Sequence, residues 1–117
     1  MKNQGAGLLS ASAAMLCALS VALAAYASHG AEGESAHRLG MAAAFAFAHG
    51  LGLIASSARR SRLALVGKLA LLLGVLLFSG SLVAAVFLQA PTTLAPAGGM
   101  LLMAGWAILA IDFLTTT

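Results

Sequence analysis

Few residues of this 117-residue chain have side chains that could do chemistry, and His49 is the first of them. It lies inside an apolar run, residues 39–57, that contains no carboxylate, lysine or arginine. If the run crosses a membrane, this imidazole is an ionisable group at a depth where such groups are costly and commonly functional. Because the pKa of an unperturbed histidine lies near neutrality, His49 would suit a proton relay. The alternative is a neutral imidazole that is hydrogen-bonded to a neighbouring helix, with Ser79 or Ser81 as the partner.

Four further residues of metal-ligand type lie close together, and they are His29, Glu32, Glu34 and His37. Imidazole and carboxylate groups are both zinc ligands. Their spacing matches no short metal-binding motif, and Gly30 and Gly33 between them favour a flexible loop. We therefore predict a solvated loop and no metal site.

Asp112 lies near the end of the last apolar run. Its expected partners are Lys68 and Arg62, because all three should lie near the same membrane interface. Such a pair is structural, although a carboxylate near a membrane exit also suits proton coupling. An enzyme needs a nucleophile with a base, paired carboxylates or a metal, and the apolar runs hold none of these. We predict no enzyme activity, no catalytic residue and no cofactor.

The composition shows what must position these residues. The chain is 62% hydrophobic and 8% charged, whereas soluble domains carry about 25% charged residues. Its four apolar runs each approach the length that crosses the roughly 30 Å core of a bilayer. We therefore predict an all-α integral membrane protein, a single domain of residues 1–117 in which four transmembrane helices form a compact bundle. The predicted spans are residues 5–27, 39–57, 66–88 and 97–114.

Small residues recur at helical spacing along the runs, a pattern that lets membrane helices approach closely. The first stripe consists of Ser10, Ala14, Ala18 and Ala22, and the second of Gly40, Ala44, Ala48, Gly52 and Ser56. The glycines expected at helix contacts are Gly40, Gly52, Gly74, Gly80, Gly98, Gly99 and Gly105. The single Cys17 excludes an intramolecular disulfide and is expected in a helix interface.

The basic residues predict the orientation. Four spans place both termini and the loop after the second span on one side of the membrane. That side carries Lys2, Arg59, Arg60, Arg62 and Lys68, and the other side carries only Arg38. By the positive-inside rule, both termini are cytoplasmic and the protein is a multi-pass protein of the inner (plasma) membrane.

The first run has a second interpretation. Lys2, the apolar run and Ala25-Tyr26-Ala27 together are typical of a secretory signal with an A-x-A cleavage site. We favour a retained span, because the run is longer than the 7–15 residues of a usual signal core. Cleavage would also discard a well-formed small-residue stripe.

Several short segments together resemble a known family. They are Ala27-Ser28-His29-Gly30, Phe45 to His49, Leu77-Phe78-Ser79-Gly80-Ser81-Leu82, Pro96-Ala97-Gly98-Gly99 and Ala104-Gly105-Trp106-Ala107. In this order and at this spacing, they are similar to the YgdD-like membrane proteins filed as domain of unknown function 423. The resemblance implies a four-helix inner-membrane protein and no established activity.

The chain departs from that family at polar positions. It has Phe45-Ala46 where the family often has Tyr-Gln, Val83 where a tyrosine is common, and Ala95-Pro96 in place of Thr-Pro. Each departure removes a polar group from the membrane interior. The chain therefore lacks the polar groups that the family often has at these positions.

Two functions remain open. In the first, the protein is a structural or interaction subunit in the lipid bilayer that packs through its small-residue faces against itself or a larger membrane complex. In the second, it is a small transporter or channel for a small solute or protons that uses His49. The net charge of +3 is too small and too localised to indicate nucleic-acid binding.

Overall fold

A computed structural model describes residues 4–115 of the chain, and they form four helices without a strand. The helices are α1 (Gln4–His29), α2 (Gly33–Ala55), α3 (Arg62–Phe87) and α4 (Leu94–Thr115). Each contains a segment that is long and apolar enough to cross a membrane. The predicted all-α membrane fold is therefore confirmed, while Lys2 lies outside the described residues.

All four helices begin before the predicted spans, and the difference is largest for α2 and α3, which begin at residues 33 and 62. α2 begins at Gly33, whose φ of 61° is a conformation that glycine adopts at little cost. α3 begins at Arg62, directly after Ser61, whose hydroxyl accepts a hydrogen bond of 3.0 Å from the backbone N–H of Ala64. This side-chain cap satisfies one of the backbone donors that the first turn of a helix leaves free.

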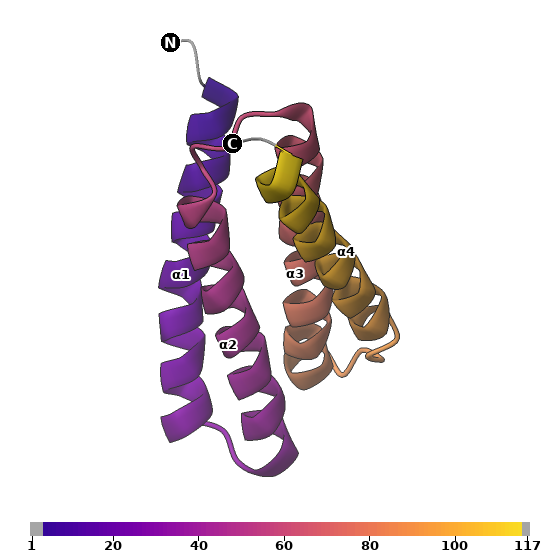
Figure 1. Ribbon diagram of the computed structural model, residues 1–117. Coiled ribbons are helices and arrows are strands. Elements are labelled where there is room, and N and C mark those ends of the chain that lie inside the picture. The colour runs from indigo at the N-terminus through magenta and orange to yellow at the C-terminus, as the bar shows by residue number, and fades with distance from the viewer. Residues whose placement is uncertain (1–3, 116–117) are drawn as a thin grey trace.

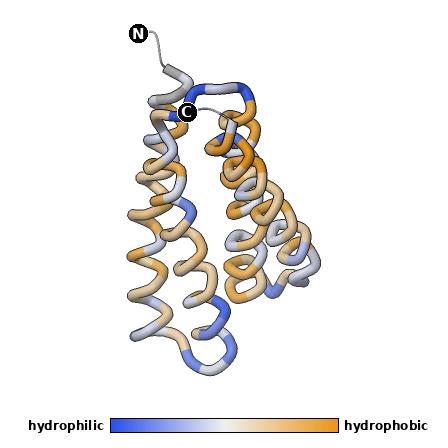
Figure 2. Tube along the Cα trace, in the orientation of Figure 1, coloured by the Kyte–Doolittle hydropathy of each residue, from blue (hydrophilic) through white to orange (hydrophobic). Residues whose placement is uncertain are grey.

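The four helices form two antiparallel hairpins that lie side by side (Figure 1). α1 packs against α2, α3 packs against α4, and the hairpins meet between α2 and α3. The start of α1, the end of α4 and the loop between α2 and α3 lie at the same end of the molecule (Figure 1). Figure 2 shows that apolar residues follow the helices, whereas hydrophilic residues gather mainly in the loops at the two ends.

The α3–α4 crossing is built from glycines of both helices. A Cβ atom added at Gly98 would lie 2.5 Å from the backbone nitrogen of Phe78 and 2.7 Å from the carbonyl oxygen of Gly74. One at Gly105 would lie 3.0 Å from the carbonyl oxygen of Gly67. The backbones of α3 and α4 therefore touch at two levels, which is the close approach that small residues permit in membranes.

At the α1–α2 crossing, the two backbones approach closely at Gly50. A Cβ atom there would lie 2.8 Å from the carbonyl oxygen of Ala13 and 2.6 Å from the sulfur of Cys17. Ala13, Cys17 and Ser20 thus form the face of α1 that packs against protein, and Cys17 lies in the α1–α2 interface.

This arrangement differs from the predicted packing of α1. Ala14, Ala18 and Ala22 of the first stripe are exposed, because the row one position earlier meets Gly50. Gly40 and Gly80 also differ, since a Cβ atom at either would meet no atom within 4 Å.

Candidate functional site

His49 lies in the middle of α2, and its side chain is buried. Its Nδ1 atom is 2.8 Å from the carbonyl oxygen of Phe45, one turn earlier in α2. Its Nε2 atom is 3.0 Å from Nε1 of Trp106, which belongs to α4. An indole N–H only donates, so Nε2 accepts and Nδ1 carries the proton that is donated to Phe45. The hydrogen bonds therefore assign a neutral imidazole with both nitrogens engaged.

Aromatic rings surround this imidazole on three helices. The Phe45 ring is stacked against the His49 ring, with 5.7 Å between the centroids. The centroid of the Phe45 ring also lies 4.5 Å from that of Phe78 in α3. A Cβ atom at Gly52 would lie 2.8 Å from the indole of Trp106, so this glycine makes room for the ring over α2. His49 is thus a polar group inside an aromatic cluster that joins α2, α3 and α4.

The two serines that were the expected partners of His49 do not bond to it in the structure. The hydroxyl of Ser79 donates to the carbonyl oxygen of Ala42 at 2.8 Å, which ties α3 to α2. Ser81 is buried, and its hydroxyl has no hydrogen-bond partner within the part of the chain that the structure describes. Trp106 was not among the expected partners of His49, and its signal in the sequence was the glycine at position 52, one turn after His49.

A second polar cluster lies where the α2–α3 loop meets the end of α4. The Asp112 carboxylate is 1% exposed and lies 2.8 Å from the terminal nitrogen of Arg59. Nε of Arg59 donates to the same carboxylate at 2.9 Å, and the hydroxyl of Ser61 donates to its other oxygen. Lys68 donates to the carbonyl oxygen of Arg59 at 2.7 Å. This network fastens the loop to α4.

Of the two expected partners of Asp112, Lys68 acts on the carboxylate through its charge, but the ion pair itself is formed by Arg59. The loop folds back over the end of α4 and brings Arg59 to the carboxylate instead. A planar guanidinium fits a carboxylate through two nitrogens, whereas an ammonium group binds it as a point charge. The guanidinium also lies 4.5 Å from the centroid of the Phe113 ring. Since each of these groups is bound to protein, the cluster is suited to fixing the fold.

The loop between α1 and α2 shows a simpler arrangement. His29 is exposed at the end of α1. Glu34 pairs with Arg38 at 3.2 Å, one turn along α2. Among residues 4–115, no three His, Cys, Asp or Glu side chains lie close enough to hold a metal ion.

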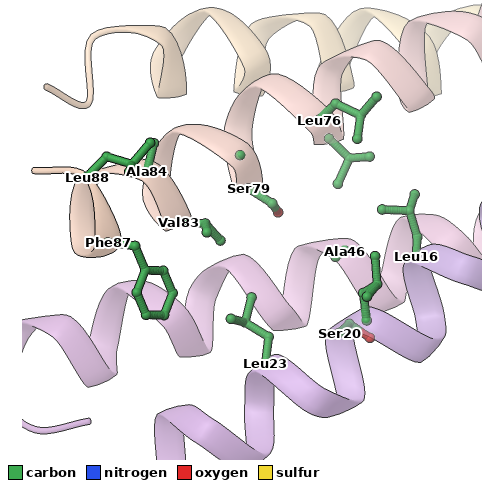
Figure 3. Close-up of a pocket in the computed structure, with 13 residues that line it drawn as sticks. Leu16, Ser20, Leu23, Ala46, Leu76, Ser79, Val83, Ala84, Phe87 and Leu88 are labelled. Atoms are coloured by element: carbon green, nitrogen blue, oxygen red, sulfur yellow. The ribbon is translucent and has the colours of Figure 1, made fainter. Parts of the chain in front are cut away.

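A hollow of about 510 Å³ lies between α1, α2 and α3. In Figure 3, Leu23 of α1 faces Val83 and Phe87 of α3 across it, and Leu16 of α1 lies nearer Leu76 of α3. Its two hydroxyl groups are already bonded, Ser20 to the carbonyl of Cys17 at 2.7 Å and Ser79 to that of Ala42. The hollow has no ionisable side chain in its lining, so it offers apolar contact rather than acid–base chemistry.

Comparison with known proteins gives one match. The family model described as "Protein of unknown function (DUF423)" matches residues 23–99. That segment contains His49 and Ser79 and stops before Trp106. No curated protein and no solved structure matches the chain. Because the family model covers more than half of its length, the chain belongs to the DUF423 family.

Proposed function

We propose that this protein is a structural or interaction subunit of the inner (plasma) membrane that packs through an exposed small-residue face of α1. The observation that supports this most is the exposure of Ala14, Ala18 and Ala22, which lie one turn apart along α1. Helices in lipid associate where small side chains let their backbones approach, because lipid tails supply no hydrophobic driving force between them. A continuous small-residue row that no helix of its own fold covers is therefore suited to a helix of another molecule.

The neighbouring side of α2 extends this face. Ala44 and Ala48 of the second stripe are also exposed. Ala24 of α1 and Gly40 and Ala44 of α2 line a shallow hollow of about 320 Å³ between the two helices. Val21 and Phe47 also line this hollow, so the α1–α2 hairpin offers a shallow depression with two large apolar side chains in its lining to a second copy or to a helix of a larger complex.

The transporter or channel alternative depends on His49, and its surroundings count against a relay. A relay needs a ring nitrogen that exchanges its proton with a mobile partner, whereas both nitrogens of His49 bond to groups of the fold. The hollow between α1, α2 and α3 is also apolar. We therefore favour the subunit function.

The charges support cytoplasmic termini. Arg59 and Arg60 of the α2–α3 loop and Arg62 at the start of α3 lie at the end of the molecule where α1 begins and α4 ends (Figure 1). At the other end, Arg38 is paired with Glu34, so less positive charge remains there. By the positive-inside rule, the arginine-rich end faces the cytoplasm.

Native electrophoresis of membranes solubilised in mild detergent tests the proposal, with Ala18→Phe as the variant. The wild-type protein is expected to migrate in an assembly larger than the monomer, and the phenylalanine should release the monomer by blocking close helix approach. Met103→Phe is the matched control, because Met103 is 67% exposed on α4, outside the α1 face. A monomeric wild type, or an assembly that Ala18→Phe leaves intact, would overturn the proposal.

A further inference from the structure

An apolar groove runs between α1 and α3, which are not a closely packed pair of helices. One part of it is the 510 Å³ hollow between α1, α2 and α3. A second hollow of about 340 Å³ lies nearer the end where α1 and α3 begin. On α3, the two hollows share one side of the helix, with Leu65, Leu69 and Leu72 in one and Leu76 in the other.

The lining residues favour a flexible apolar occupant. Leucines make up most of the lining of the second hollow, with Leu8 and Leu9 from α1 and Leu65, Leu69 and Leu72 from α3 beside the small Gly5 and Ser12. Such large side chains hold another backbone at a distance, and close helix approach depends on small residues. An acyl chain needs no close backbone approach, because its apolar contacts are non-directional.

The mouth of this groove is basic. Arg62 is exposed at the first residue of α3, and Leu65 and Leu69 follow it at three and seven residues, on the same face of the helix. Arg60, in the loop between α2 and α3, is also exposed. Within residues 4–115, the carboxylate side chain at this end is that of Asp112, which is buried and paired with Arg59.

The length of the leucine face fits one leaflet. A helix rises about 1.5 Å per residue, so residues 62 to 72 cover about 15 Å. This is half of the roughly 30 Å hydrocarbon core of a bilayer. A lipid with its head group at Arg62 would therefore extend its acyl chain as far as Leu72.

We propose that the α1–α3 groove binds an anionic phospholipid, with the phosphate of the head group at Arg62 and an acyl chain along Leu65, Leu69 and Leu72. Charge complementarity selects the anionic lipid, and the leucine lining accepts the chain. The site is separate from the small-residue face of α1, so neither proposal depends on the other.

Native mass spectrometry of the delipidated protein tests the site by titration with dioleoyl phosphatidylglycerol or dioleoyl phosphatidylcholine. We expect wild-type protein to retain the anionic lipid more tightly. Arg62→Gln should weaken that lipid about fivefold, because a basic residue at an anionic surface contributes about 1 kcal/mol. Arg38→Gln, at the other end of the molecule, is the matched control and should leave the affinity unchanged.

A second pair of variants tests the chain-binding part. Leu69→Trp fills the groove and should weaken both lipids, whereas Leu73→Trp changes an exposed residue of α3 outside the groove and should weaken neither. If Leu69→Trp loses its helical circular dichroism, Ser12→Phe fills the same hollow from α1. Equal retention of the two lipids by the wild type would overturn the proposal. So would unchanged binding in Arg62→Gln, or lipid-free dimers that the groove-filling variants dissociate.

Discussion

The α3–α4 hairpin places Gly67, Gly74, Gly98 and Gly105 between its two helices, whereas the α1–α2 hairpin leaves a row of alanines on its outside. Gly98 and Gly105 lie against the backbone of α3, and Arg59 fastens the end of α4 through Asp112. By contrast, only 11% of the residues in the most apolar 18-residue segment of α1 are buried in the fold. The corresponding share is 28% in each of α3 and α4. Small residues therefore build the interior of one hairpin and remain free for an external contact in the other.

The largest effect should come from closing the space at the α3–α4 crossing. Gly98→Leu forces a side chain against the backbone of Phe78 and Gly74, neither of which yields like a flexible side chain. We expect the free energy of unfolding to fall by about 3 kcal/mol, the upper end for an overpacked core. Unfolding in mixed micelles with increasing sodium dodecyl sulfate measures this. Gly80→Leu, at a glycine with open space, is the control, and equal losses in the two variants would contradict the glycine crossing.

A smaller loss is expected from releasing the end of α4. Arg59→Gln takes the guanidinium away from the buried Asp112 carboxylate, and a buried charge that loses part of its compensation destabilises a fold. The loss is only partial, because the hydroxyl of Ser61 and the charge of Lys68 still act on the carboxylate. The thermal midpoint should therefore fall, and the double variant with Asp112→Asn should recover part of the loss. Arg62→Gln, at an exposed position in the first turn of α3, serves as the control. A midpoint that is lowered as much by the double variant as by Arg59→Gln would show that the pair is not what fastens α4.

The hydrogen bond between His49 and Trp106 should contribute still less to the free energy of unfolding. A double-mutant cycle of His49→Phe and Trp106→Phe isolates it, and we expect a coupling free energy of about 0.6 kcal/mol, the average for hydrogen bonds between membrane helices. The same unfolding assay supplies the four values. A cycle of Trp106→Phe with Ser79→Ala, whose hydroxyl bonds to Ala42, should give no coupling. Absence of coupling between His49 and Trp106 would contradict the assigned hydrogen bond.

The smallest effect is expected where the fold leaves a glycine in open space. Gly40→Ala adds a methyl group that meets no atom within 4 Å. Stability in the unfolding assay should stay unchanged or rise slightly, since alanine favours a helix over glycine. A clear destabilisation would show that Gly40 contacts something that the isolated chain lacks, which would bring the face between α1 and α2 into an interface.

The spans could be predicted from the sequence because hydropathy alone decides which segments enter a bilayer. The side of α1 that faces the rest of the protein could not be predicted, because alanines lie on several sides of this helix. The stripe through Ala14 is as regular as the row through Ala13. Gly50, across the interface, selects the row of Ala13. This choice depends on how two helices cross, which neither helix encodes by itself.

The polar partners were predicted less well, for a related reason. His49 and Asp112 were recognised as buried polar groups because charged and polar residues are rare in the apolar runs. Their partners, Trp106 and Arg59, lie 57 and 53 residues away in sequence and come from the crossing of α4 and the path of a loop. Spacing along the chain carries no information about either.

The most direct test of the exposed α1 face is a photo-crosslinking scan along α1 in native membranes, with a photoreactive residue placed at each position from 14 to 23 in turn. We predict adducts to protein at positions 14, 18 and 22, and lipid adducts alone at the exposed positions 15 and 19. Protein adducts without this periodicity, or lipid adducts along the whole of α1, would contradict a docking face made of small residues.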